Sequence, residues 1–516
     1  MSEQSVPKVI VVGAGNAALV TALAASEAGA SVVVLEAASK EERGGNSRFS
    51  GSIFRFAHGG SEEIADLLGD ALPDQSSEWT KRVRVNPYPR QRYLDDLMSA
   101  SGGRGDAALL TKLVEESQET MWWLKKQGIQ WEFIRGKLID PDNLQPEELY
   151  WLPEGGAVRC VDEGVGLVAL LFDAVESDPR IEIRYESPVR ELIVDGRSVT
   201  GVRVGSDSGT YDLHGPVVLA CGGFEASPRL RRQYLGENWD LVKVRGTRYN
   251  TGGMLEEAIR IGAQAVGHWG GCHAALLASE APAVGDITQI EAQSTKGSLT
   301  SPMSRYSYPY SIMVNLDGER FVDEGEDEVF LTYATMGRKV LAQRDATAFQ
   351  LFDQRTVHLL EQRYASSEPA VADTIDELAE KIGVPAERLA ATVASYNAAT
   401  SSGKEFNAFA KDGLATTGLV PPKSNWALPL DEPPFLAYRV TCGITFTYGG
   451  LRIDTQARVH DSSDRPIEGL YATGEITGGF FYDNYPGGSG LMRGAVYGRT
   501  AGQEAAEAAK RSTSGD

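Results

Sequence analysis

The first part of the chain alternates apolar runs with a helical pattern. Residues 8–12 (KVIVV) form a short β-branched run typical of an inner parallel strand. A helical stretch follows at 18–29, and a second apolar run, SVVVLE, ends in Glu36. This strand–helix–strand order predicts a parallel α/β sheet near the N-terminus.

The pattern changes from about residue 270 to about residue 445. A polar, loop-rich part (279–310) precedes a strand–turn pair at 311–324, and helical patterns follow at 374–383 and 385–400. Thr374 stands before the first helix and Gly383 after it, where helix caps are expected. We therefore predict that one domain, 1–270 and 446–516, is interrupted by an α+β domain at 271–445.

Composition narrows the range of functions. Hydrophobic residues make up 42% and charged residues 23%, as expected for a folded enzyme. The formal net charge of −21 argues against nucleic acid and anionic membranes as partners. No apolar run approaches the ~20 residues that span a bilayer, and the start shows no export signal, so we expect a cytoplasmic protein. The four cysteines lie far apart, without the spacing of a disulfide framework or a metal site.

The first candidate binding site lies between the two N-terminal strands. Gly13 permits a tight turn, Gly15 lets the backbone approach a pyrophosphate, and the following helix directs its N-terminus at the phosphates. Glu36 ends the second strand, about 20 residues past the glycines, where a carboxylate binds ribose hydroxyls. The agreement of strand, glycines, helix and acid predicts an ADP-binding site, and Glu36 disfavours the extra phosphate of NADP.

Four stretches in this order resemble one superfamily. They are the polar glycine-rich loop Glu42–Gly51, the strand and glycine pair Val217–Phe224, Gly469–Ile476, and Tyr485–Leu491. Together they resemble the fumarate reductase and succinate dehydrogenase flavoprotein superfamily. The resemblance implies an α/β fold with a Rossmann-like FAD-binding domain of the glutathione-reductase type. The inserted domain would be a mobile cap that closes over the substrate.

The resemblance also implies which residues hold FAD. The loop that carries a histidine for covalent attachment in some relatives has no histidine until His58, so we expect non-covalent FAD. The predicted cofactor-binding residues are Gly13, Gly15, Asn16, Ala17, Glu36, Ala37, Gly44, Gly45, Asn46, Ser47, Ser50, Gly51, Ala220, Gly222, Gly474, Glu475, Gly488, Ser489, Gly490 and Leu491.

At substrate level the chain resembles the tricarballylate dehydrogenases, which desaturate a tricarboxylate. The matching stretches include 244–252, 271–274, 318–327 and 481–488. The chain departs from fumarate reductases, because acids replace their proton-delivering arginine and Tyr485 replaces their substrate-binding arginine. A tyrosine before Pro-Gly also resembles the ketosteroid 1-dehydrogenases, where it polarises a carbonyl.

Desaturation needs a hydride acceptor, a base and donors that steady negative charge. The donors we nominate are His273, Tyr485 and an arginine from Arg245, Arg248 and Arg305. Tyr333, Tyr308 and Glu328 are candidates for the base, and a tyrosine would need a cationic neighbour for that task. A solvated acidic turn is expected for at least two of Glu326, Asp327 and Glu328.

Three hypotheses follow. The first is an FAD-dependent desaturase, or its reverse, acting on a small polycarboxylate. The second is the same chemistry on a ketone such as a 3-ketosteroid, and the third is a flavin redox module without turnover. No metal is expected in the site. A separate protein or a quinone would take the electrons, because the sequence offers no second cofactor site.

Overall fold

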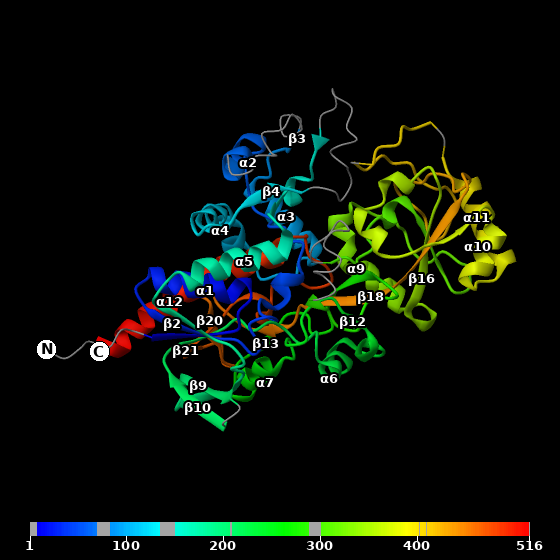
Figure 1. Cartoon of the computed structure of the whole chain (residues 1–516). Coiled ribbons are helices and arrows are strands. Elements are labelled where there is room, and N and C mark those ends of the chain that lie inside the picture. Colours follow the sequence, from blue (N-terminus) through cyan, green and yellow to red (C-terminus); the bar gives the residue numbers. More distant parts are fainter. Residues whose placement is uncertain are drawn as a thin grey trace. The chain divides into compact units, whose positions relative to one another are not determined.

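The computed structural model describes residues 8–69, 83–134, 150–206, 209–287, 301–401, 403–408 and 410–514. The chain forms two compact units. The first unit combines Met1–Phe133, Pro153–His273 and Thr445–Asp516, and the second combines Ile134–Leu152 and Ala274–Ile444. The colours of Figure 1 show the first unit's discontinuity, because blue and orange strands share one sheet. That the second unit caps the flavin stays a prediction.

A six-stranded sheet, β20-β21-β11-β1-β2-β7, forms the centre of the first unit. Its inner strands are parallel, with Val11 opposite Val34 on one side and opposite Val218 on the other. Both faces of these strands are buried, which explains their unbroken apolar sequences. The strands are β1 (Lys8–Val12), β2 (Ser31–Leu35), β7 (Ile181–Arg184), β11 (Val217–Leu219), β20 (Arg458–His460) and β21 (Pro466–Ala472).

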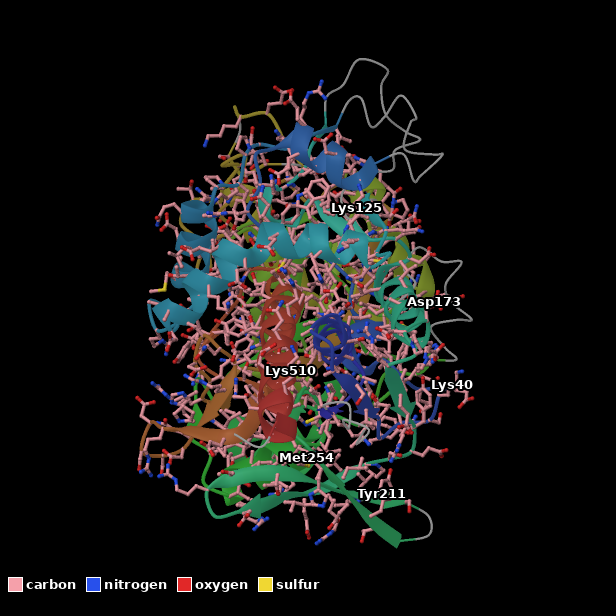
Figure 2. The ribbon with its side chains drawn as sticks, turned by 90° about the vertical axis from the view of Figure 1, so that its left-hand side faces the viewer. Lys40, Lys125, Asp173, Tyr211, Met254 and Lys510 are labelled. Atoms are coloured by element: carbon pink, nitrogen blue, oxygen red, sulfur yellow. The ribbon has the colours of Figure 1, made fainter. Side chains whose placement is uncertain are left out.

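Helix α1 (Asn16–Glu27) packs along α12 (Ser489–Ser514), and Figure 2 shows α12, with Lys510 labelled, beside the dark blue α1. Glycines at every fourth position of α12 make this packing close. An added Cβ at Gly498 would lie 2.9 Å from the Ala17 carbonyl oxygen, and one at Gly502 would lie 2.9 Å from the Ala25 nitrogen. The glycine side of α12 therefore lets two helix backbones meet.

Smaller elements complete the first unit. A three-stranded antiparallel sheet of β8, β9 and β10 packs against α7, and Figure 2 labels Met254 on α7 near Tyr211 on β10. The bounds are β8 (Val189–Asp195), β9 (Ser198–Ser206), β10 (Gly209–His214), α2 (Ser61–Leu68), α3 (Arg90–Ala100), α4 (Ala107–Lys126), α5 (Glu163–Glu176), α6 (Pro228–Leu230) and α7 (Gly253–Arg260). Short strands are β3 (Val83–Arg84), β4 (Trp131–Phe133), β6 (Val158–Cys160), β12 (Lys243–Val244), β13 (Ala265–Val266) and β19 (Gly450–Leu451).

The second unit is α+β. Strand β16 pairs antiparallel with β15 and β18, and two helices pack on an apolar cluster that includes Leu378, Leu389 and Tyr396. The predicted caps are confirmed: Thr374 Oγ accepts a hydrogen bond from Glu377 N, and Gly383 takes a left-handed conformation. The bounds are β14 (Cys272–Ala278), β15 (Ile312–Asn315), β16 (Thr347–Phe352), β17 (Ala370–Ala372), β18 (Phe435–Thr447), α9 (Val329–Leu341), α10 (Ile375–Ile382) and α11 (Ala386–Ala399).

The chain passes between the two units within β14 and near the end of β18. The α/β fold class predicted from the sequence is confirmed. Within the described ranges no helix has both the length and the apolar character needed to cross a bilayer.

The helix contact gives a first prediction. Gly502→Ala should lower the free energy of unfolding by about 1–3 kcal/mol, the usual cost of overpacking, because the new methyl group would overlap the backbone of α1. Thermal unfolding of the FAD-saturated protein measures the effect. Gln503→Ala, at the exposed neighbouring position, is the control and should leave the melting temperature unchanged. Equal melting temperatures for the two variants would show that α1 and α12 do not need the glycine.

Candidate functional site

An elongated cavity opens in the first unit at the carboxyl ends of the parallel strands. Its empty volume is about 1180 Å³, part of it open to solvent. Its walls come from the β1–α1 turn, the end of β2, the 42–47 loop, the glycine pair after β11, the 247–255 segment and Glu475. This is where open α/β sheets bind ligands.

One end of the cavity carries a buried carboxylate. Glu36 is 7% exposed, and its Oε1 accepts a hydrogen bond from Ala38 N at 2.8 Å. Burial raises the pKa of Glu36, and the backbone N–H groups of Ala38 and its neighbours oppose that shift. The carboxylate is thus held inside the cavity, as the ribose-binding prediction requires.

The glycine turn before α1 is shaped for close approach. Gly13 has φ +105°, and a Cβ there would lie 2.6 Å from the Ala220 carbonyl oxygen. Asn16 N donates to Ser47 Oγ at 2.9 Å, and Asn16 Nδ2 donates to the Leu491 carbonyl oxygen at 3.0 Å. The turn, the 42–47 loop and the start of α12 are therefore tied together.

Asn46 fixes the glycine-rich loop from within. Its Nδ2 donates to Glu225 Oε1 at 2.6 Å and to the Thr445 carbonyl oxygen at 2.7 Å, while its Oδ1 accepts from Thr247 N at 2.8 Å. The Asn46 amide is thus used to connect three chain segments. Asn46 also lines the cavity.

A buried pair of carboxyl groups lies beside the cavity. Glu225 is fully buried and interacts electrostatically with Glu475, which lines the cavity. Asn250 Nδ2 donates to Glu225 Oε1 at 2.6 Å, and Thr447 N donates to Glu475 Oε1 at 2.8 Å. Burial raises the pKa of both carboxyls, and the neighbouring charge of Glu475 raises that of Glu225 further. Glu225 is therefore held toward its protonated form.

The turn before α12 is held by a hydrogen-bond network that no sequence motif indicated. Arg55 is 4% exposed, and its Nε donates to the Gly487 carbonyl oxygen at 2.8 Å. Its Nη1 donates to the Tyr88 hydroxyl at 2.8 Å, and that hydroxyl donates to Asp96 at 2.5 Å. A Cβ at Gly488 would lie 2.8 Å from Arg55 N. Arg55 therefore positions the predicted flavin-binding turn.

Two of the predicted catalytic residues come together. The Tyr485 hydroxyl lies 3.3 Å from His273 Nδ1, and both side chains are buried, at 6% and 1% exposure. Phe446 packs edge-on against both rings, and Phe481 lies against Tyr485 with ring centroids 5.3 Å apart. The arrangement is a polar pair set in an aromatic wall.

Arg248 points elsewhere than predicted. Its side chain is 61% exposed, and its Nε lies 3.5 Å from Glu42 Oε1. Tyr249 also donates to Glu42, at 2.6 Å. Glu42 and Tyr249 line the cavity, so Arg248 pairs with an acid of the cavity wall in its own unit.

Arg305 and Tyr308 are internal residues of the second unit. Arg305 is fully buried and donates to the carbonyl oxygens of three residues and to the hydroxyls of Ser366 and Ser367. Tyr308 is fully buried against Thr332, and burial raises the pKa of its phenol, the opposite of what a base needs. Neither Arg305 nor Tyr308 is therefore placed to act as a substrate ligand or base.

The remaining candidates also lie in the second unit. Tyr333 is 8% exposed, with its ring edge-on to Tyr306. Glu326 pairs with Lys339 and Asp327 pairs with Lys411, both at partly exposed positions that match the expected acidic turn. The identity of the base stays open.

Twelve of the predicted cofactor residues line the cavity, and eight do not. Those that do are Gly13, Gly15, Asn16, Ala17, Glu36, Ala37, Gly45, Asn46, Ser47, Ala220, Gly222 and Glu475. Those that do not are Gly44, Ser50, Gly51, Gly474, Gly488, Ser489, Gly490 and Leu491. Sequence reasoning missed Glu42, Gly223, residues 188–190 and most of 247–255, although the polar stretch GTRYNTGG was a visible signal that we assigned to substrate.

The residues of the cavity fit an adenine dinucleotide. Glu36 offers a carboxylate for ribose, and the glycine turn leaves room for a pyrophosphate. Asn16 Oδ1 is buried in the wall without a hydrogen-bond partner among the described residues, so a ligand hydroxyl or a water would satisfy it. Glu225 Oε2, which is buried beside the cavity, also has no hydrogen-bond partner among the described residues.

Comparison with known families agrees with this geometry. Residues 8–77 and 88–491 match the family described as FAD binding domain. The chain belongs to this family. It is a flavoprotein oxidoreductase, FAD-dependent and acting on CH–CH bonds, as its fumarate reductase relatives are. A redox module without turnover is therefore excluded.

Relatives cover nearly the whole chain. A protein named probable fumarate reductase Ifc3, from Shewanella frigidimarina, is 29% identical over 97% of this chain and 75% of its own length. A 4-oxocyclohexanecarboxylate 2-dehydrogenase from Sinomonas cyclohexanicum is 29% identical over 96% of this chain and 93% of its own. The structure of a 3-ketosteroid Δ1-dehydrogenase from Sterolibacterium denitrificans has the same fold, with a TM-score of 0.70, 22% identity and coverage of 97% of this chain and 100% of that one.

The carboxyl pair predicts a pH dependence of stability. Burial raises the pKa of Glu225 above its ordinary 4.5, so the folded protein binds this proton more tightly than the unfolded chain does. The stability that the proton provides is present at low pH and is lost as the pH rises above 4.5 toward the raised value.

Glu225→Gln keeps the neutral, hydrogen-bonding form at every pH. Its melting temperature relative to the wild type should therefore rise progressively as the pH is raised above 4.5. The control is Glu62→Gln, at an exposed position on α2, whose difference from the wild type should stay constant. A constant difference for Glu225→Gln as well would mean that folding does not raise the pKa of Glu225.

Proposed function

We propose that the enzyme oxidises or forms a CH–CH bond next to a carbonyl group, with Tyr485 as the group that binds the carbonyl oxygen and His273 as the group that orients its hydroxyl. The observation that carries this proposal is the buried Tyr485–His273 pair. When His273 Nδ1–H donates to the Tyr485 oxygen, the Tyr485 O–H can donate to a substrate oxygen whose negative charge grows during the reaction. Bound FAD would supply the hydride acceptor.

The surroundings of the pair support a ketone. Aromatic rings of Phe446, Tyr448 and Phe481 pack around Tyr485. Such a wall favours the apolar part of a substrate and strengthens polar contacts by keeping water away. This reverses the order of our sequence-based hypotheses, in which a small polycarboxylate stood first and a ketone second.

Arg245 is the remaining candidate for a carboxylate. Its Nε donates to Thr445 Oγ1 at 3.0 Å, and Thr445 directly precedes Phe446 of the aromatic wall. Of the three arginines nominated from the sequence, Arg248 pairs with Glu42 and Arg305 is used internally. We therefore propose an oxo acid, with its carbonyl at Tyr485 and its carboxylate toward Arg245. A relative named for 4-oxocyclohexanecarboxylate supports this choice.

Tricarballylate is the second candidate, because the motif resemblance that suggested it covers most of the chain. It requires more than one cationic partner for three carboxylates. Non-covalent attachment of FAD, a cytoplasmic location, and reoxidation by a separate protein or a quinone also remain proposals.

A substrate test separates the candidates. The purified holoenzyme is mixed anaerobically with 4-oxocyclohexanecarboxylate, cyclohexanone, a saturated 3-ketosteroid or tricarballylate, and the visible flavin band is followed. We expect bleaching by the oxo acid, weaker bleaching by cyclohexanone, and none by tricarballylate. Bleaching by tricarballylate alone would overturn the carbonyl proposal.

A variant tests the role of Tyr485. Tyr485→Phe should bind FAD as the wild type does, because its hydroxyl contacts His273 rather than the cavity wall. It should slow flavin reduction by the oxo acid by ~100-fold or more, the scale of losing one key donor. Stopped-flow absorbance gives the rate, and Tyr482→Phe, on the same loop, is the matched control. An unchanged rate would remove Tyr485 from the mechanism.

A further inference from the structure

Arg493 is a buried cation with few protein partners. It lies in the first turns of α12, is 2% exposed, and donates one hydrogen bond, from Nη1 to the Thr477 carbonyl oxygen at 3.2 Å. Its Nε has no hydrogen-bond partner among the described residues. Burial lowers the pKa of Arg493 to about 10, so the guanidinium stays charged at neutral pH.

This location is energetically costly. A buried charge requires a partner, and a cation near the N-terminus of a helix is disfavoured by the helix dipole. The guanidinium lies over the rings of Phe480 and Phe481, at 5.3 and 4.9 Å from their centroids. Cation–π contacts of this kind offset part of the cost. A buried cation with this energetic cost is a candidate for a role beyond packing.

The groups that face Arg493 come from three segments. Glu475 lines the cavity, and Tyr448 and Tyr485 belong to the aromatic wall. All three interact electrostatically with the guanidinium. Phe481 contacts Arg493 and both tyrosine rings.

Tyr485 is thus placed between two kinds of neighbour. His273 Nδ1 lies 3.3 Å from its hydroxyl, and Arg493, which contacts Phe481 as Tyr485 does, interacts electrostatically with Tyr485. Negative charge that develops on the Tyr485 oxygen would be attracted to this cation.

We propose that Arg493 is a positioning residue that makes Tyr485 a stronger hydrogen-bond donor to the substrate carbonyl by stabilising negative charge on its oxygen. The inference rests on the proposed role of Tyr485. In the dehydrogenation direction, a base would take the proton beside the carbonyl, and the hydrogen on the next carbon would leave as hydride, for which bound FAD would be the acceptor. The carbonyl oxygen gains negative charge as the proton leaves and loses it as the new double bond forms, and the Tyr485 O–H would stabilise that charge by a hydrogen bond.

The test reads the ionisation of Tyr485 directly. 3-Fluorotyrosine is placed at position 485 of the FAD-loaded enzyme, and its ¹⁹F resonance is followed as the pH is raised. Arg493→Met, of similar size without the charge, should move the titration midpoint upward by about one pH unit or more, the scale expected for loss of a nearby opposite charge. Arg493→Lys should titrate close to the wild type.

Controls keep the result interpretable. Arg499→Met removes an arginine from the same helix that pairs with Glu119, and it should leave the midpoint unchanged. If Arg493→Met does not fold or bind FAD, Arg493→Gln, which can still donate to Thr477, replaces it and should show the same upward shift. An unmoved midpoint in the charge-free variant would overturn the inference and leave Arg493 as a counter-charge for Glu475 alone.

Kinetics separates this inference from the proposed function. If Tyr485→Phe reduces its flavin at the wild-type rate, the proposed function fails whatever Arg493 does. If Tyr485→Phe is slow but Arg493→Met leaves the ¹⁹F titration unmoved, only the inference fails. If both hold, Arg493→Met should lower kcat more than it raises KM, with the alkaline limb of the pH profile moved in the direction of the ¹⁹F midpoint.

Discussion

The close approach of α1 and α12 is the contact on which the first unit depends. These helices stand at opposite ends of the sequence, and each begins at a glycine-containing turn. Glycines along α12 let it touch the backbone of α1, so Asn16 reaches the Leu491 carbonyl oxygen. Without this contact the N-terminal glycine turn and the C-terminal glycine turn would have no fixed relation.

Several buried charged side chains lie in and beside the site. Burial raises the pKa of Glu225 and Glu475, Arg493 interacts electrostatically with Glu475, and Arg55 holds the turn before α12. Buried charges of this kind contribute little net stability compared with apolar side chains of the same volume. Their value lies in fixed electrostatic potential and fixed geometry, both of which a reaction that moves hydride and proton requires.

The structure favours a carbonyl substrate over a polycarboxylate because two of the nominated arginines already bind other groups of the protein. Arg305 was one of three arginines nominated as a donor to the substrate, but its own donors bind the backbone of the second unit. Arg248 pairs with Glu42, which lines the cavity. What remains around Tyr485 and His273 is aromatic, and this favours a carbonyl compound over a small polyanion.

The sequence alone determined the local elements. Strand β1, helix α1 and strand β2 lie where the apolar runs predicted them, and Thr374 and Gly383 cap α10. It also placed Gly13, Gly15 and Glu36 at one site, because a glycine turn and a strand end in a βαβ unit are neighbours by local geometry.

Only the tertiary structure determined which side chains from distant segments contact one another. The Glu225–Glu475 pair, the hold of Arg55 on Gly487 and the meeting of Tyr485 with His273 all join segments more than 200 residues apart. Whether an arginine binds a substrate or a backbone carbonyl depends on which acceptors the fold brings within about 3 Å. Local sequence carries no record of that distance, because it is set by the packing of helices and strands that are remote along the chain.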